Sequence, residues 1–251
     1  MISKDIITLN DPTSLAAESY KMFRSNLHYM NVDADKQVIM FTSSLAGEGK
    51  TTSIANVAVS FAQDGKKTLL IECDLRRARV HMAFGIPQLP GVTNVLTSDC
   101  PLDKAIVNLD EEPLLDILPG GPLPPAPAEL LGSNALESLV KEARGKYDKI
   151  LIDAPPILSV TDGVVLNRLV DGVVLVVAAN ETRKDVISRA IELLNKLDAN
   201  LLGVLISKME FKRNSYYNYG YSYGQEKDSK NPFKRKSKKS NSIKYQEEVT
   251  K

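Results

Sequence analysis

The sequence contains no tryptophan and only two cysteines, Cys73 and Cys100, so a framework of disulfide bonds is excluded. It also lacks a long apolar run, since the stretch GVVLVVAA at 172–179 is far shorter than the ~20 residues of a membrane-spanning helix. The first residues, MISKDIITLND, lack the uninterrupted apolar core of a secretory signal. Together these absences predict a reduced, cytoplasmic protein that does not cross a membrane.

Aromatic residues are scarce, at 6% of the chain, and yet five of the nine tyrosines fall within eight positions. This tyrosine cluster consists of Tyr216, Tyr217, Tyr219, Tyr221 and Tyr223. It lies in residues 208–251, which have 12 Lys and Arg against 5 Asp and Glu, whereas the preceding residues carry a net charge of −6. The segment is rich in Lys, Ser, Asn and Gly and cannot bury a core, so we expect a flexible, disordered basic tail. Such a tail is either simply solvated or attracted to an anionic surface such as the inner leaflet of a membrane.

The preceding part of the chain alternates apolar runs with helical patterns. The runs resemble strands that are buried on both faces and cover 37–43, 67–73, 114–120, 148–154, 171–179 and 200–207. Helical spacing is found at 15–30, 52–65, 127–145 and 184–197. Strands that alternate with helices predict an α/β fold with a doubly wound, mostly parallel sheet. We therefore expect an N-terminal segment at 1–36, a P-loop domain at 37–207 and a tail at 208–251.

The first apolar run leads directly into a phosphate-binding motif. From Ser44 the sequence reads S-x-x-x-x-G-K-T, a P-loop with serine in the first glycine position. Its glycines let backbone N–H groups approach phosphate oxygens, its lysine contacts the β- and γ-phosphates, and the next hydroxyl binds Mg²⁺. A glycine-rich turn without a ligand is the alternative. The motif predicts ATP and Mg²⁺ as cofactors, and the expected nucleotide-binding residues are Ser44, Ala46, Gly47, Glu48, Gly49, Lys50, Thr51 and Thr52.

Acidic residues follow two further predicted strands. LLIECDLRR places Glu72 and Asp74 at the end of one strand, and KILIDAPP places Asp153 at the end of another. Because ligands of open α/β sheets bind at the carboxyl ends of the strands, we expect all three acids to face the Mg²⁺–nucleotide. An acid at either position alone could merely cap a loop, but the P-loop favours a ligand role. Thr51, Asp74 and Asp153 are the predicted metal ligands.

The P-loop, the acidic strand end of the D-x-D-x-R type, the D-x-x-P strand end and the tyrosine cluster together resemble the bacterial tyrosine kinases (BY-kinases). The resemblance extends from about Glu18 to Tyr223 and includes ILPGGPLPPAPAELL at 117–131. It implies an ATP-dependent protein-tyrosine kinase that autophosphorylates the tyrosine cluster. The resemblance also implies the catalytic residues, which are Lys50 of Walker A, Glu72 and Asp74 of the acidic motif, and Asp153 of Walker B.

Two positions depart from the family pattern. Glu72 stands where the family usually has an aspartate that is assigned as the catalytic base, and its longer carboxylate can still accept the tyrosine proton. The stretch ESYKMFR resembles the oligomerisation motif E-x-x-R-x-x-R, with Glu18 and Arg24 retained but Lys21 replacing the first arginine. Lysine does not replace arginine freely where a carboxylate is bound bidentately. Oligomerisation through this helix and simple packing of the helix on the sheet both remain interpretations.

The resemblance further implies partners and a location. The chain would form a homo-oligomeric ring whose subunits phosphorylate one another, and a separate transmembrane adaptor would activate it. A cognate tyrosine phosphatase would reverse the reaction, and other proteins would be substrates. The kinase would be cytoplasmic, peripheral at the inner face of the cell membrane through the adaptor, and would regulate synthesis and export of capsular or extracellular polysaccharide. No nucleic-acid partner is expected.

Two other functions share the predicted fold. A Min/Par-type ATPase, which positions other proteins by nucleotide-driven dimerisation, carries a signature lysine early in the P-loop, where this chain has Leu45. Such ATPases also lack a tail of clustered tyrosines. The other alternative is a non-enzymatic nucleotide-binding scaffold, in which Glu72 marks a lost activity. Purified protein and ATP would distinguish the three by phosphate on tyrosine, free phosphate only, or neither.

Overall fold

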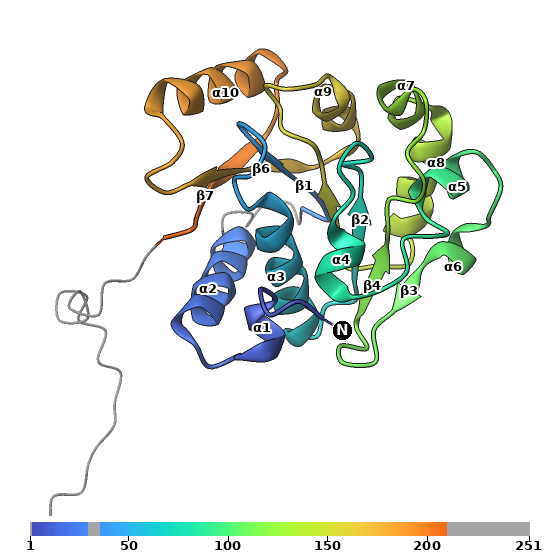
Figure 1. The fold of residues 1–251 in the computed structure, drawn as a ribbon, viewed down its shortest axis with the longest axis horizontal. Helices are drawn as coiled ribbons and strands as arrows, with labels where there is room; N and C mark the ends of the chain where they lie inside the picture. Colours follow the sequence, from blue (N-terminus) through green and yellow to red (C-terminus); the bar gives the residue numbers. More distant parts are fainter. Residues whose placement is uncertain (1, 30–35, 210–251) are drawn as a thin grey trace, which may run out of the picture. The chain divides into compact units, whose positions relative to one another are not determined.

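The computed structural model describes residues 2–29 and 36–209, and the tyrosine cluster lies outside the described residues. These described residues form one compact unit (Figure 1). In the described part of the chain, no helix combines the length and apolar character that crossing a bilayer requires.

A seven-stranded sheet runs through this unit (Figure 1). Its strands are β1 (Val38–Ser43), β2 (Thr68–Glu72), β3 (Val107–Asn108), β4 (Leu115–Leu118), β5 (Lys149–Asp153), β6 (Gly172–Ala178) and β7 (Leu201–Ser207). The spatial order is β3-β4-β2-β5-β1-β6-β7, and only the β3–β4 pair of this described sheet is antiparallel. The predicted doubly wound, mostly parallel sheet is confirmed, and all six predicted strands are present.

Helices cover both faces of the sheet, as a doubly wound fold requires (Figure 1). One face is covered by α1 (Ile7–Asn10), α2 (Leu15–Tyr29), α3 (Lys50–Gln63) and α4 (Val80–Phe84). The other face is covered by α5 (Val92–Leu96), α6 (Leu102–Ala105), α7 (Pro127–Leu131), α8 (Asn134–Arg144), α9 (Asp162–Leu166), η1 (Asn167–Leu169) and α10 (Lys184–Lys196). Successive strand residues alternate between the two cores, so Ile150 and Ile152 enter one and Leu151 the other.

Two features of the sheet differ from the prediction. The antiparallel β3 was missed because its two residues form no apolar run. β7 is not buried on both faces, since it lies at the sheet edge and leaves Val204 and Ile206 40% and 53% exposed. Its apolar composition is that of a central strand, and only the strand order shows that it has one neighbour.

The prediction of a single helix at 127–145 is wrong. α7 ends at Leu131, and α8 begins at Asn134 after Ser133, whose backbone is extended (φ −74°, ψ 156°). The apolar spacing continues across the break because Leu131 and Leu136 enter the same core. Hydrophobic periodicity alone therefore predicts one helix where the backbone forms two.

The N-terminal segment packs on α3 and on the sheet within the same compact unit. The Arg24 guanidinium donates a hydrogen bond to the carbonyl of Ser60 at 2.7 Å and pairs with Asp64 at 3.1 Å. The Phe23 ring meets the ring of Phe41 edge-on, with 6.3 Å between the centroids. Polar and aromatic contacts thus fasten α2 to the body of the protein.

Candidate active site

The predicted P-loop joins β1 to α3 at the carboxyl edge of the sheet. Gly47 and Gly49 have φ values of +86° and +79°, which residues with a side chain rarely adopt. α3 begins at Lys50, so the unpaired N–H groups of its first turn lie at the loop. The two glycines therefore form the tight turn that the motif predicts, at a helix N-terminus suited to anions.

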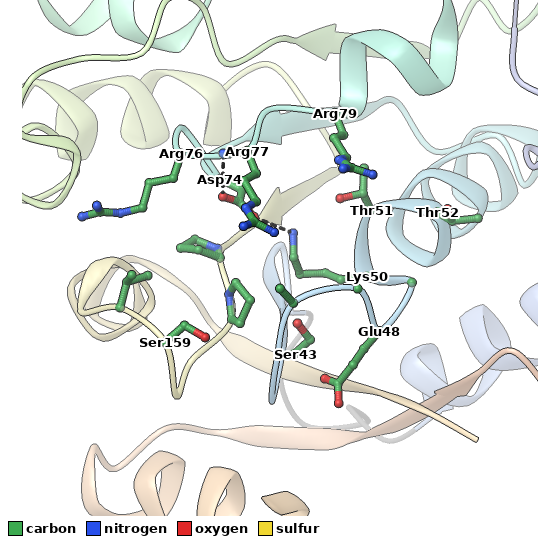
Figure 2. Close-up of a pocket in the computed structure, with 16 residues that line it drawn as sticks. Ser43, Glu48, Lys50, Thr51, Thr52, Asp74, Arg76, Arg77, Arg79 and Ser159 are labelled. Atoms are coloured by element: carbon green, nitrogen blue, oxygen red, sulfur yellow. Dashed lines mark hydrogen bonds and ion pairs between the residues drawn. The ribbon is translucent and has the colours of Figure 1, made fainter. Parts of the chain in front are cut away.

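A cavity of about 540 Å³ lies over the P-loop (Figure 2). Residues 46–52 line it, which are seven of the eight predicted nucleotide-binding residues. The remaining one, Ser44, is fully buried and its hydroxyl has no hydrogen-bond partner among the described residues. The volume lies within the range of small-molecule and cofactor sites.

Lys50 and Asp74 lie together at this cavity (Figure 2), and Asp153 pairs with Lys50 beside it. The Lys50 ammonium donates a hydrogen bond to Asp153 and lies 3.6 Å from the Asp74 carboxylate. The Thr51 hydroxyl donates to the other oxygen of Asp153 at 2.8 Å. Because β5 lies between β1 and β2, the residues at the ends of these three strands meet at one point.

The two carboxylates differ in their access to the cavity. Asp74 lines the cavity, whereas Asp153 has no exposed surface and lies behind Lys50 and Thr51. Burial raises the pKa of Asp74 above its ordinary value, and the positive charge of Lys50 offsets this rise only in part. A carboxylate with a raised pKa at the edge of a cavity is suited to accept a proton.

Glu72 has different surroundings from those expected. It has no exposed surface and does not line the cavity. Its carboxylate accepts hydrogen bonds from the backbone N–H groups of Val80 at 2.6 Å and Gly120 at 2.9 Å, and also from that of Arg79. The Glu72 carboxylate therefore binds two loops together, and its assignment as the catalytic base stays a prediction.

Burial raises the pKa of Glu72 to about 7 and lowers that of His81, whose Nδ1 lies 3.9 Å from the Glu72 carboxylate. Nδ1 of His81 is buried and has no hydrogen-bond partner among the described residues. Neutral imidazole has one nitrogen that accepts hydrogen bonds. The nearby Asp153 carboxylate further raises the pKa of Glu72, while the three backbone donors lower it. A proton on Glu72 is thus held close to a nitrogen that can accept a hydrogen bond.

We expect Glu72 to make the protein less stable as the pH rises from 4.5 to about 7. Below pH 4.5 the group is protonated in both the folded and unfolded states, whereas within this range only the folded protein holds the proton. The free energy of unfolding should fall by up to about 3 kcal/mol through this group and then level off. Urea unfolding at pH 5 and pH 8 measures the fall, and Glu72→Gln should show a smaller one. Equal falls in the two proteins would contradict the pKa assigned to Glu72.

The donor set fits Mg²⁺. Among the described residues there is no cluster of three His, Cys, Asp or Glu side chains that could hold a metal ion alone. Mg²⁺ usually keeps several waters and binds through one or two carboxylates together with substrate phosphates. Thr51, Asp153 and Asp74 supply a hydroxyl and two carboxylates beside the P-loop, which is that kind of hard-oxygen set.

Three arginines follow β2 and line the cavity (Figure 2). Arg76 forms two hydrogen bonds, of 2.9 and 3.1 Å, with the buried carboxylate of Asp162 on α9. Arg77 and Arg79 add positive charge beside the lysine of the P-loop. Arg79 is not part of any motif noted in the sequence, although the basic run RRAR directly after a strand end is a usable signal. Ser159 and Val160 were also missed, and no motif marks them.

The expected oligomerisation residues lie on α2 and do not line the cavity. Lys21 pairs with Glu18 at 2.7 Å and donates a hydrogen bond to the carbonyl of Pro12 at 2.8 Å. Arg24 is held by α3, as described above. The structure therefore accounts for all three side chains within one chain, and an oligomeric role stays a prediction.

Comparison with known proteins gives consistent relatives. A family model described as an AAA domain matches residues 36–205. The chain is 40% identical over 218 residues to the tyrosine-protein kinase YwqD of Bacillus subtilis. The aligned region covers 87% of this chain and 92% of YwqD. The crystal structure of the chimerical protein CapA2B2 matches with a TM-score of 0.80 and 33% identity, over 83% of this chain and 92% of that one. The kinase domain of the Escherichia coli tyrosine kinase ETK matches with a TM-score of 0.77 and 27% identity, over 88% and 84% of the two chains.

Proposed function

The chain belongs to the AAA-domain family and to the bacterial tyrosine-protein kinases, and on this basis we propose that it transfers the γ-phosphoryl group of ATP to tyrosine. The observation that carries the proposal is the convergence of Lys50, Thr51, Asp74 and Asp153 at a cavity over the P-loop. Catalysis of phosphoryl transfer consists mainly of positioning and of stabilising charge. This site supplies both.

Each side chain has a distinct part in this proposal. The P-loop amides and Lys50 bind the β- and γ-phosphates, and Arg77 and Arg79 add positive charge where the phosphoryl group is transferred. Thr51 and Asp153 would hold Mg²⁺, which when bound neutralises charge on the phosphate oxygens, and the Asp74 carboxylate would stay free of the metal. Binding of the nucleotide requires Lys50 to exchange its carboxylate partners for phosphate oxygens.

We assign proton acceptance from the tyrosine hydroxyl to Asp74 rather than to Glu72. Asp74 lines the cavity, whereas Glu72 is enclosed by backbone N–H groups. A general base must come within hydrogen-bond reach of the proton that it removes. Glu72 then acts as a positioning residue, because its carboxylate holds Arg79 and Gly120 in place.

The tyrosine cluster is the proposed acceptor. β7 ends at Ser207, whose hydroxyl donates a hydrogen bond to the P-loop carbonyl of Glu48 at 2.5 Å. Tyr216 follows nine residues later in the sequence. Nine residues span at most about 30 Å when extended. β7 therefore ends beside the P-loop, and we propose that an acceptor tyrosine serves its own site or that of a neighbour.

A ring of subunits is the proposed arrangement for transfer between neighbours. On α2, Leu15, Met22 and Tyr29 are spaced seven residues apart and are 45%, 67% and 74% exposed. Side chains at that spacing lie on one face of a helix, so they form an apolar stripe beside Glu18. Such a stripe supports a contact between subunits through α2.

Mixing two chains tests transfer between subunits. An inactive Lys50→Met chain that retains its tail is combined with an active chain truncated after Met209. We expect phosphotyrosine on the inactive chain, because the tail of one subunit enters the site of another. No phosphate on that chain, together with wild-type autophosphorylation at a rate independent of concentration, would contradict a ring.

A separate transmembrane adaptor, a cognate phosphatase and control of polysaccharide synthesis and export belong to the same proposal. The proposed location is the inner face of the cell membrane, through the adaptor. Family membership supports these partners, and the net charge of +7 in residues 208–251 supports attraction to an anionic leaflet. The activity of the isolated chain should rise when a cytoplasmic segment of the adaptor is added.

Incubation of the purified chain with radiolabelled ATP and Mg²⁺ tests the reaction itself. A kinase labels tyrosine, whereas a Min/Par-type ATPase releases free phosphate and a scaffold does neither. We expect label on tyrosine that is lost when the five clustered tyrosines are replaced by phenylalanine. Label that persists at full strength in that variant would place the acceptor elsewhere.

A further inference from the structure

The side chain of Glu48 belongs to the P-loop but not to its phosphate chemistry. It is 5% exposed, and its carboxylate points away from Lys50 and Asp74 (Figure 2). One carboxylate oxygen accepts the N–H of Leu45 at 2.9 Å, across the loop, and the other accepts the hydroxyl of Thr182 at 2.5 Å. The carboxylate therefore fixes the curvature of the loop and ties it to the segment after β6.

The main chain of the same residue is tied to β7. Ser207, the last residue of β7, is 9% exposed and donates its hydroxyl to the carbonyl of Glu48 at 2.5 Å. A Cβ atom on Gly49 would lie only 3.2 Å from the Ser207 hydroxyl oxygen. Thr182 in turn accepts the N–H of Ala178 at the end of β6 at 3.0 Å. The P-loop thus rests directly on the carboxyl ends of β6 and β7.

We propose that Thr182 and Ser207 are positioning residues of the phosphate site, which act through Glu48 and couple the P-loop to the end of β7. The inference rests on the proposed nucleotide site. Neither residue lines the cavity. A P-loop binds phosphate through backbone N–H groups, whose directions depend on the torsion angles of the loop. Bonds that fix those angles in advance reduce the cost of ordering the loop when the ligand binds.

The coupling is reciprocal. If the end of β7 favours the binding-competent P-loop, a bound nucleotide must stabilise the end of β7 to the same extent. The proposed acceptor tyrosines follow β7 in the sequence. A bound nucleotide would therefore stabilise the strand end that precedes them. This gives the hydrogen bond between Ser207 and Glu48 a role beyond the stability of the fold.

Equilibrium binding of Mg·ADP tests the proposal without depending on kinase activity. Ser207→Ala leaves the Glu48 carbonyl without its buried donor and should weaken binding about tenfold. Ser207→Thr keeps the hydroxyl and should bind within about twofold of the wild type. Thr182→Val and Thr182→Ser form a second matched pair with the same expectation. A Ser207→Ala/Thr182→Val double variant should lose less binding free energy than the two single variants lose together, because both substitutions act through one loop conformation.

Thr68→Val is the control for stability alone, because the Thr68 hydroxyl at the start of β2 is also buried and donates to a backbone carbonyl, that of Lys66, at 2.8 Å. It should lower the unfolding temperature but leave ADP affinity unchanged. Hydrogen exchange supplies a second measurement: Mg·ADP should protect amides at 204–207 in the wild type, and Ser207→Ala should abolish that protection at saturating ADP. Wild-type affinity and protection in Ser207→Ala would overturn the coupling alone, whereas no ADP binding by the wild type would overturn the nucleotide site as well.

Discussion

A chain with Lys50→Met will form phosphotyrosine at least about a thousandfold more slowly than the wild type. The Lys50 ammonium lies beside the cavity, where it can stabilise the negative charge that develops on the transferred phosphoryl group. Methionine fills similar space but carries no charge. Its present contacts with Asp153 and Asp74 show that the ammonium can be held beside the cavity in a fixed position. Single-turnover transfer of labelled phosphate at saturating Mg·ATP measures the loss.

The same substitution should also destabilise the fold. Without the ammonium, Asp153 is a buried carboxylate with a second carboxylate nearby and no positive partner, which costs about 3 kcal/mol. A Lys50→Met/Asp153→Asn double variant restores the charge balance, so it should recover stability but not activity. This control separates loss of folding from loss of catalysis. Phosphotyrosine formation near the wild-type rate in either variant would contradict the role of Lys50.

Asp74→Asn will lower the rate of phosphate transfer by about 10²–10³-fold, because an amide cannot accept the tyrosine proton. Mg·ADP binding should fall far less, since the P-loop and Lys50 are intact. The pH dependence of the rate offers a second readout. Burial raises the pKa of Asp74, so the wild-type rate should rise with pH as this carboxyl loses its proton, and the variant should lack that rise.

Glu72→Gln is the matched comparison, and it should affect stability more than turnover. The carboxylate accepts N–H donors on both oxygens, from Val80 on one side and Gly120 on the other. An amide can accept on one side only and then places its NH₂ against an N–H group, which costs about 1–3 kcal/mol. If Glu72→Gln folds stably but loses transfer while Asp74→Asn retains it, the two roles are reversed and Glu72 is the base.

Local signals in the sequence were sufficient for the P-loop and for the strands that carry it. The P-loop residues lie within five positions of one another, namely Gly47, Gly49, Lys50 and Thr51. A short turn between a strand and a helix is enough to place them for phosphate binding. Asp153 was predictable as well, because it directly ends an apolar strand at the same sheet edge. Such features depend on few neighbours, so composition and spacing reveal them.

Features that depend on distant segments could not be predicted. Glu72 was expected to face the nucleotide, but the loops at 79–80 and 120 enclose its carboxylate, and the sequence of β2 does not show this. The bond from Ser207 to Glu48 joins residues 159 positions apart. β7 has the composition of a central strand and is an edge strand only because of the sheet order. In each case the missing information is tertiary.

Residue-resolved mass spectrometry of the purified chain after incubation with Mg·ATP tests the central claim most directly, when ADP release is measured in the same reaction. We predict phosphate on the tyrosine cluster, Tyr216 to Tyr223, with about one ADP formed for each phosphotyrosine, because the γ-phosphoryl group moves to tyrosine rather than to water. The Lys50→Met chain should show neither product. Continuous ADP release without phosphotyrosine would mean that the site hydrolyses ATP, and it would contradict the assignment of this chain as a tyrosine kinase.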